Sequence, residues 1–301
     1  MQRNPWFITL LIILSFCWAV TYIFVKIGDK TIPPFILMTW RAFFAFILLF
    51  VVCIFSKKPI AKYIFNAKAQ LVFIFSAITI AYMWFALAKS EQVITAAMSS
   101  FLLTTLVIFS WIIATFFTKE KPFYYINMLG IIIAVMGVIV MLGFKNVFFG
   151  NKSFWYALLY PSGLAVFAIS AAATKYSGLR IPPIVSTTYN FFYTILILSL
   201  FAFIFEKPLA QSYSINSIVS VLVIGLIGTG VGYLIFFWLV AKAGQVFASM
   251  SGYIVPIFGF LMSIGLLNEP FQWHQIVGLV IVFLGTFLTN QEKPKISIEQ
   301  T

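Results

Sequence analysis

One charged side chain, Arg41, lies well inside an apolar run of this sequence. A charge at membrane depth costs at least about 3 kcal/mol, so such a residue must face protein or water. The guanidinium could bind a substrate carboxylate or gate an outer opening. Alternatively, it could anchor a broken helix by hydrogen-bonding backbone carbonyls, and this structural role is the one we favour. The neighbouring Trp40 is interpreted as an aromatic residue of the membrane interface.

Four further titratable side chains lie near the ends of apolar runs. Lys26 and Lys175 each precede an Ile-Pro-Pro sequence at the same offset, so they are candidates for paired gates that close in alternation. Lys89 is interpreted mainly as a lysine that snorkels to the surface, with a gating role as the alternative. His274 is the only histidine and could titrate near neutral pH, although its position beside Trp273 favours an interfacial role.

Aromatic and hydroxyl side chains at helical spacing could form the walls of a binding site. Tyr82, Phe85 and Lys89 follow an i, i+3, i+7 spacing, which places them on one helical face. A strip of hydroxyls at i, i+4 spacing follows, which either lines a cavity or packs with its hydroxyls bonded to i−4 carbonyls. The strip consists of Thr95, Ser99, Ser100 and Thr104.

Five more aromatic residues are candidates for substrate contacts, because aromatic walls with a few polar groups suit an amphipathic metabolite. They are Trp18, Tyr22, Tyr160, Tyr233 and Tyr253. Pro161 is expected to break its helix, and Pro256 is expected to kink its helix and free backbone carbonyls.

Acidic residues are expected only in loops and at the ends of apolar runs. The complete set is Asp29, Glu91, Glu120, Glu206, Glu269, Glu292 and Glu299. A proton-coupled carrier usually needs a titratable group inside the membrane, most often a carboxylate. The sequence therefore favours facilitated export down a gradient over proton antiport.

The elements that would position these residues are membrane-spanning helices. Hydrophobic residues make up 62% of the chain and charged residues 9%, which is far from the composition of soluble domains. We expect an all-α integral membrane protein of about ten helices, each long enough to cross a hydrocarbon core of about 30 Å. The predicted spans are approximately 6–27, 33–56, 69–88, 93–117, 123–143, 153–174, 182–205, 217–240, 244–267 and 272–290.

The second half of the chain repeats the first. Residues 1–150 and 151–301 are expected to form two five-helix repeats, and an odd number of spans per repeat inverts the second around a central cavity. Pro122-Phe123, Gly130 and Gly137 have the same spacing as Pro270-Phe271, Gly278 and Gly285. Glycines seven residues apart share one helical face and allow close helix packing.

Lysine and arginine predict the orientation. With the N-terminus inside, twelve lie on the cytoplasmic side and six on the opposite side, which favours two cytoplasmic termini in a bacterial inner membrane. The basic residues are interpreted as topological anchors, because no basic stripe interleaved with base-stacking aromatics indicates nucleic-acid binding. We keep the first apolar run as a mature helix because it is too long for a signal peptide.

This pattern resembles the drug/metabolite transporter superfamily, and within it the EamA-type exporters. The residues that carry the resemblance are Trp18, Lys26, Pro33-Pro34, Trp40-Arg41, Glu120, Glu269, Pro256 and the glycines named above. The second repeat departs from the first at Asn190, which corresponds to Arg41. The resemblance implies a basket of helices around a central cavity that exports small metabolites by alternating access.

A secondary transporter is therefore the favoured function, ahead of an intramembrane enzyme or a structural subunit. One histidine, one aspartate and no Walker loop argue against metalloprotease, aspartyl protease and ATP-driven classes, and no cofactor or metal is expected. Amino acids or related zwitterions are the expected substrates. Nucleotide sugars, S-adenosylmethionine or diverse drugs are the alternatives. The oligomeric state stays open, and a monomer is compatible with the sequence.

Overall fold

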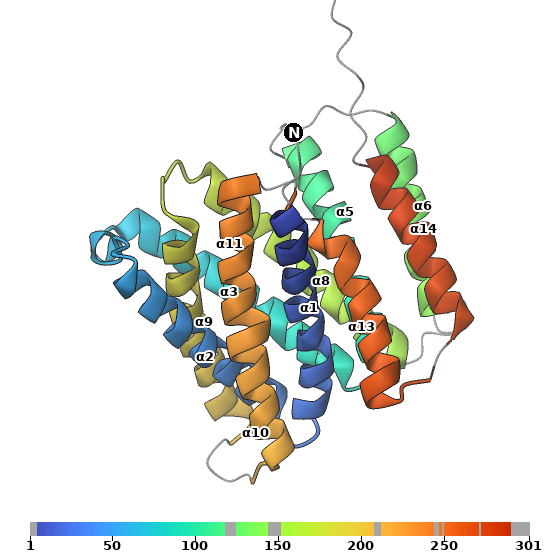
Figure 1. Cartoon of the computed structure of the whole chain (residues 1–301), viewed down its shortest axis with the longest axis horizontal. Helices are drawn as coiled ribbons and strands as arrows, with labels where there is room; N and C mark the ends of the chain where they lie inside the picture. Colours follow the sequence, from blue (N-terminus) through green and yellow to red (C-terminus); the bar gives the residue numbers. More distant parts are fainter. Residues whose placement is uncertain are drawn as a thin grey trace, which may run out of the picture.

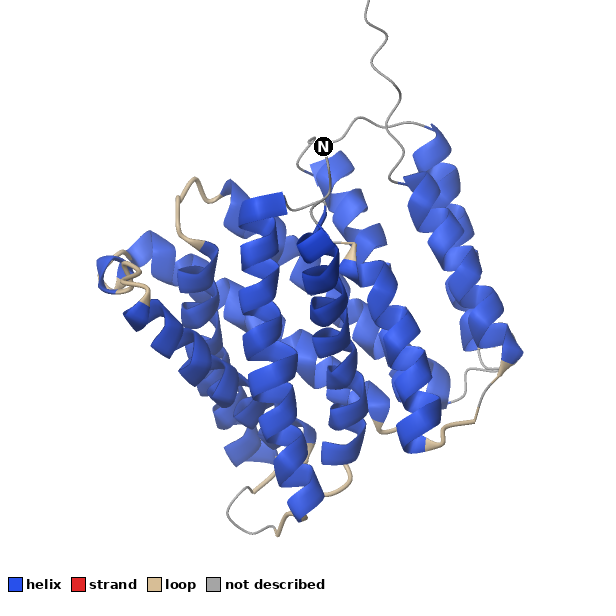
Figure 2. Cartoon of the chain, in the orientation of Figure 1, coloured by secondary structure: helices blue, strands red, loops and turns tan. Residues whose placement is uncertain are grey.

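The computed structural model describes residues 5–117, 125–143, 152–207, 212–243, 247–248, 250–270 and 272–289, and helices dominate these residues, without strands (Figure 2). The main helices are α1 (Pro5–Gly28), α2 (Pro34–Phe55), α3 (Ala67–Glu91), α4 (Ala96–Leu102), α5 (Thr105–Ile112), α6 (Tyr125–Leu142), α8 (Lys152–Tyr176), α9 (Pro183–Phe205), α10 (Ile215–Leu222), α11 (Gly232–Ala243), α13 (Ser251–Leu267) and α14 (Trp273–Thr289). Two π-helical segments, Ile113–Phe117 and Val223–Val231, extend α5 and join α10 to α11.

These helices form ten apolar membrane-helix segments, which we call rods, so the predicted fold class is confirmed. Six are long and apolar enough to cross a membrane, and four shorter apolar helices complete the set. The fourth rod is α4 with α5, and the eighth is α10, the second π-helical segment and α11. Both described ends, Pro5 and Thr289, lie at the same end of the bundle, as an even number of spans requires (Figure 1). We call this end the terminus side and the opposite end the far side.

The local sequence determines where several helices begin. Pro34 and Pro183, the second prolines of the two Ile-Pro-Pro sequences, are the first residues of α2 and α9. Proline suits this position because its missing N–H has no partner there and its φ angle is already helical. Asn66 caps α3 by accepting a hydrogen bond from the N–H of Ala69 at 3.0 Å.

Helices of one half pack against helices of the other half, and the pattern of pairs stays the same when the two halves are exchanged. Helix α2 packs on its counterpart α9, and α6 packs on its counterpart α14. Helix α3 packs on α8, and correspondingly α1 packs on the rod formed by α10, the π-helical segment and α11. Core positions therefore lie between helices of different halves, and residues from both halves can meet at the centre.

Four glycines bring α6 and α14 into backbone contact, at one side of the bundle (Figure 1). A Cβ atom added to Gly285 would lie 2.4 Å from the backbone nitrogen of Ala134, and one added to Gly130 would lie 2.5 Å from that of Thr289. Gly137 and Gly278 face each other in the same way. The close packing predicted from the seven-residue glycine spacing is thus confirmed.

The predicted break at Pro161 is wrong, because α8 continues through it from Lys152 to Tyr176. Neighbouring helices and polar side chains tolerate proline in membrane helices by satisfying the freed backbone groups. Helix α13 also continues through Pro256, and a bend there stays a prediction. The described helices lose α-helical regularity elsewhere, at Leu103–Thr104 and in the two π-helical segments.

The glycine contact predicts that Gly285→Val destabilises the protein. The new side chain would overlap the backbone of Ala134, and such overpacking costs about 1–3 kcal/mol. Thermal unfolding in detergent should show a clearly lower midpoint for this variant. Gly265→Val is the matched control, since a Cβ there meets nothing within 4 Å. Equal midpoints for the two variants would contradict the packing described.

Candidate functional site

Arg41 is buried inside the described bundle and contacts both halves. The residue is only 6% exposed. Its guanidinium carbon lies 4.2 Å from the centre of the Trp84 ring, a cation–π contact. Its Nε donates a hydrogen bond of 2.9 Å to Oγ1 of Thr229 in the second half. Another guanidinium nitrogen makes a long contact of 3.9 Å with the sulfur of Met38.

The π-helical segment explains why Thr229 can accept this bond. The Thr229 hydroxyl donates to the carbonyl of Ile224, five residues earlier, at 2.8 Å, which leaves its lone pairs for Arg41. Gly225 allows α2 to approach, because a Cβ there would lie 3.1 Å from the backbone oxygen of Arg41 and 2.7 Å from Phe44. Arg41 is thus anchored to an irregular helix by a hydroxyl, where the sequence suggested backbone carbonyls.

Aromatic side chains from five helices lie near this arginine, either next to it or in contact with its aromatic neighbours. The hydroxyls of Tyr22 and Tyr160 are 3.0 Å apart. The ring of Tyr233 lies 6.2 Å from Trp18 and 5.5 Å from Phe191, measured between ring centres. We call this group the central cluster; it consists of Trp18, Tyr22, Arg41, Trp84, Tyr160, Phe191, Thr229 and Tyr233. Five of its eight members were candidates from the sequence, and the structure brings them together.

The sequence missed Trp84, Phe191 and Thr229. On α3 it favoured Tyr82 and Phe85, but Tyr82 is 37% exposed and bonds Ser162 at 2.8 Å. Phe85 stacks on Phe35 with 4.2 Å between ring centres, outside the central cluster. The buried face of α3 instead combines Trp84 with small residues. That face includes Ala77, Ala81, Trp84, Ala88 and Glu91, all buried, and its small residues are the signal that could have identified it.

Most side chains of the hydroxyl strip form hydrogen bonds with the backbone of their own helix. Thr95 caps α4 by accepting from the N–H of Met98 at 3.2 Å. Ser100 and Thr104 donate to the carbonyls three residues earlier, at 2.7 Å each. Ser100 also packs against Gly259 of α13. Within the strip, Ser99 is the exception, since its buried hydroxyl has no hydrogen-bond partner.

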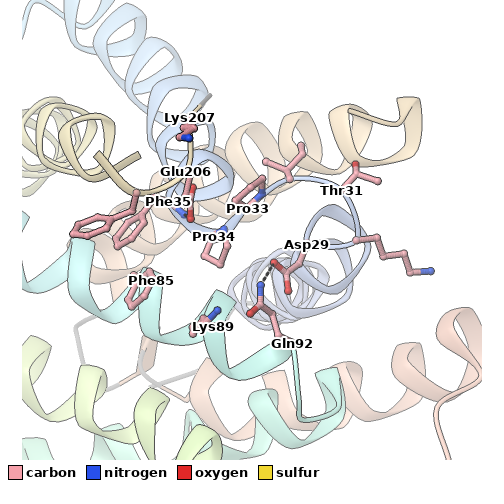
Figure 3. A pocket seen from close by; sticks show the side chains of 13 residues that line it. Asp29, Thr31, Pro33, Pro34, Phe35, Phe85, Lys89, Gln92, Glu206 and Lys207 are labelled. Carbon is pink, nitrogen blue, oxygen red and sulfur yellow. Dashed lines mark hydrogen bonds between the residues drawn. The ribbon is translucent and has the colours of Figure 1, made fainter. Parts of the chain in front are cut away.

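A cavity of about 840 Å³ opens on the far side, where α1, α3 and α9 end (Figure 3). Phe35 and Phe85 form part of its apolar wall, and charged side chains surround them. These include Asp29, Lys30, Lys89, Glu206 and Lys207. The amide nitrogen of Gln92 donates to Asp29 at 3.1 Å across one wall. A cavity with both signs of charge and aromatic faces can receive a zwitterionic or amphipathic solute.

The electrostatics of this cavity depend on pH. Burial raises the pKa of Asp29 to about 6, although the hydrogen bond from Gln92 and the nearby Lys26 and Lys89 act in the opposite direction. Burial also raises the pKa of Glu206, opposed by the N–H groups of Phe35 and Ile36. These two N–H groups lie in the first turn of α2 and donate to the Glu206 carboxylate at 2.9 Å each. The dipole of α2 stabilises a negative charge at this end of the helix.

The predicted gate residues take different positions. The ammonium of Lys26 donates to the backbone carbonyls of Glu91 and, at 2.7 Å, of Ile94, so it fastens the α3–α4 connection on the far side. Lys89 lines the far-side cavity. Lys175 belongs to α8, but its side chain lies outside the described part of the structure, as does Glu120.

His274 and Tyr253 lie apart from the central cluster. His274 joins the start of α14 to the end of α6 through a 3.2 Å contact between its Nδ1 and the carbonyl oxygen of Met141. Its Nε2 lies 2.6 Å from the side-chain oxygen of Gln272. The Tyr253 ring packs edge-on against Phe283 of α14 at 5.7 Å. Neither the cavity nor the central cluster includes them.

Glu91 lies at the end of a helix, as expected from the sequence, but its side chain is buried. Helix α3 extends to this residue, three residues beyond the predicted span, and Glu91 is 0% exposed. Both of its carboxylate oxygens lack a hydrogen-bond partner. Among the described residues, no group of three or more histidine, cysteine, aspartate or glutamate side chains could hold a metal ion.

The chain belongs to the EamA-like transporter family, whose model matches residues 5–143 and again residues 154–291. The double match agrees with the repeated halves of the fold. It also defines the chain as a membrane transporter of the drug/metabolite transporter superfamily, which is not an enzyme family.

Individual relatives are distant but match nearly the full length. An uncharacterized transporter of Bacillus subtilis, YoaV, is 22% identical over 280 residues, covering 93% of this chain and 95% of that protein. An uncharacterized transporter of Archaeoglobus fulgidus is 23% identical over 288 residues, covering 94% and 97%. The protein PagO of Salmonella typhimurium is 22% identical over 283 residues, covering 93% and 91%.

A crystal structure of another protein shares the fold. It superposes with a TM-score of 0.67 at 12% identity, and the match covers 94% of this chain and 96% of that one.

The Arg41–Thr229 bond predicts different effects for two substitutions. Thr229→Val keeps the shape but removes the acceptor, and leaving a buried charged donor unpaired costs about 1–3 kcal/mol. Thr229→Ser keeps the hydroxyl and should cost less. Thermal unfolding in detergent should therefore rank wild type, then the serine variant, then the valine variant. Equal midpoints for the valine and serine variants would show that the bond does not contribute.

The raised pKa of Asp29 predicts a pH-dependent stability. The folded protein holds this proton up to about pH 6, whereas the unfolded chain releases it near the ordinary value of 3.8. The contribution of Asp29 to stability is thus present at low pH and lost as pH rises through about 6, by no more than about 3 kcal/mol. Unfolding midpoints should fall less between pH 4 and pH 7 in Asp29→Asn than in wild type. Identical pH profiles would contradict this assignment.

Proposed function

We propose that this transporter exports small zwitterionic metabolites, most simply amino acids, by alternating access. The observation that carries the proposal is the position of Arg41. Its hydrogen-bonding and stacking partners are Thr229, Met38 and Trp84, all uncharged, and no carboxylate among the described residues forms an ion pair with it. A buried guanidinium without a carboxylate partner is suited to accept one from a solute.

The surroundings of Arg41 favour an amphipathic solute. Tyr22 and Tyr160 offer hydroxyls close to the arginine, and the faces of Trp84, Trp18 and Tyr233 offer apolar surface. Because α1, α2 and α3 meet α8, α9 and α11 here, a shift of one half against the other would open this site to either side. We propose the central cluster as the solute site, with Ser99 and Thr104 as further candidates.

The far-side cavity fits an exit route in this proposal. Positive residues are more numerous at the terminus side, which supports an orientation with both termini in the cytoplasm and the cavity outside a bacterial plasma membrane. Lys26 would then fasten the outer gate, with Lys89 beside the exit and Lys175 as its candidate counterpart on the inner side. We also propose residue 150 as the boundary between the two domains.

Counterflow in liposomes tests the function. The full-length chain is reconstituted with unlabelled amino acids inside, and uptake of a labelled amino-acid mixture is followed. We expect uptake above that of empty liposomes. Uptake of labelled nucleotide sugars or S-adenosylmethionine instead would replace the substrate class. Absence of uptake for every one of these solutes would contradict the proposal.

The same assay tests Arg41. Arg41→Met removes the charge but keeps much of the side-chain volume, so uptake at low solute concentration should fall about tenfold or more, equivalent to roughly 1.4 kcal/mol of lost binding. Trp40→Phe is the matched control, since Trp40 is 45% exposed on the neighbouring face of α2. Equal uptake by both variants would exclude Arg41 from the site.

A further inference from the structure

Glu91 is a buried acid that the fold leaves without hydrogen-bond donors. It is the last residue of α3 and is 0% exposed, and neither carboxylate oxygen has a hydrogen-bond partner. The ammonium of Lys26 is adjacent but donates to the backbone carbonyls of Glu91 and Ile94. The Ser99 hydroxyl faces the carboxylate and, like it, has no hydrogen-bond partner.

Three other carboxylates in the described residues do have hydrogen-bond donors. Asp29 accepts from Gln92, Glu206 accepts from two N–H groups at the start of α2, and Glu269 accepts from the N–H of Ala96 at the start of α4. An ionised carboxylate buried without donors costs several kcal/mol. The described conformation therefore suits a neutral, protonated Glu91.

The charged and titratable neighbours place Glu91 between the two sites already described. Lys26 on α1, Asp29 after α1 and Glu269 before α14 act on it electrostatically, and Ser99 of α4 faces it. Tyr22, Tyr160 and Arg41 of the central cluster also interact electrostatically with Glu91. Its chain neighbours Lys89 and Gln92 line the far-side cavity. A proton at Glu91 is thus close to both the cavity and the central cluster.

We propose that Glu91 is a proton-binding site that couples export to proton entry, a role that rests on the proposed transport function. In the described conformation the acid is neutral and Lys26 fastens the α3–α4 connection. When Glu91 releases its proton to water on the inner side, the carboxylate attracts the Lys26 ammonium away from the carbonyls of Glu91 and Ile94. A proton from the outer solution then neutralises Glu91 and returns Lys26 to those carbonyls. One proton enters per cycle, and no covalent bond other than the O–H bond changes.

The coupling belongs to one half of the protein. When Gln92-Val93 is aligned with Gln245-Val246, the residue that corresponds to Glu91 is Gly244. The second repeat therefore carries no second copy of this acid, and we assign one proton per cycle to Glu91.

Gradient-driven transport and infrared spectroscopy together test this proposal on the full-length chain. Liposomes with an acidic lumen, at zero membrane potential, are given the labelled amino-acid mixture. We expect wild type to accumulate label up to about tenfold per pH unit, and Glu91→Gln to equilibrate without accumulating while its exchange without a gradient stays within about twofold. Glu292→Gln, in the chain after α14, is the matched control and should accumulate as wild type does. Accumulation by Glu91→Gln equal to wild type would overturn the proposal.

The infrared measurement does not depend on a transported solute. Purified wild type near pH 7 should show a carboxylic-acid C=O band that is missing from Glu91→Gln and from the second variant Glu91→Met, which is apolar and of similar shape. The same spectrum in all three proteins would show that Glu91 is ionised and would overturn the proposal. If wild type transports no amino acid but shows the Glu91 band, the substrate class fails and the protonated site stands.

Discussion

A charge inside a bundle that lipid surrounds has to be satisfied by the protein itself, and this constraint organises the interior of the molecule. Arg41 meets it through the Trp84 ring and the Thr229 hydroxyl. Lys26 meets it through the carbonyl of Glu91 at the end of α3 and that of Ile94 in the α3–α4 connection. Each of these contacts joins elements that are distant in the chain, so each fixes helix positions as well as a charge.

Irregular backbone supplies several of the polar groups that these contacts need. The π-helical segment Val223–Val231 contributes Thr229, and its glycines bring it close to α1 and α2. The α3–α4 connection contributes the carbonyl of Ile94 that binds Lys26. By contrast, α6 and α14 are regular, and their glycines pack backbone against backbone. Irregular backbone thus supplies polar contacts, whereas the regular helices α6 and α14 pack through their glycines.

The sequence predicted the features that depend on hydropathy, glycine spacing and repetition. Ten helices, the repeat and the α6–α14 contact follow from such local patterns. Arg41, Trp18, Tyr22, Tyr160 and Tyr233 were identified because a polar or amphipathic residue in an apolar run is conspicuous.

The features that were missed depend on how helices rotate and where they end. The face of α3 was wrongly chosen because Tyr82 and Phe85 are more conspicuous than the small residues beside Trp84. Glu91 was expected at the end of an apolar run, as found, but its burial was not foreseen because hydropathy ends before α3 does. The effect of Pro161 depends on neighbours that a single-helix argument does not include. Tertiary packing decides each of these points.

In our proposal, the cluster around Arg41 is a solute site that is reached from both sides of the membrane. Cysteine accessibility tests it most directly, with Tyr160→Cys introduced after Cys17 and Cys53, the two buried native cysteines, are replaced. A membrane-impermeant thiol reagent is applied from each side of reconstituted vesicles in turn. We expect labelling from both sides, and we expect a transported solute to slow it. Absence of labelling from both sides in a folded protein would show a closed, packed core and would contradict it.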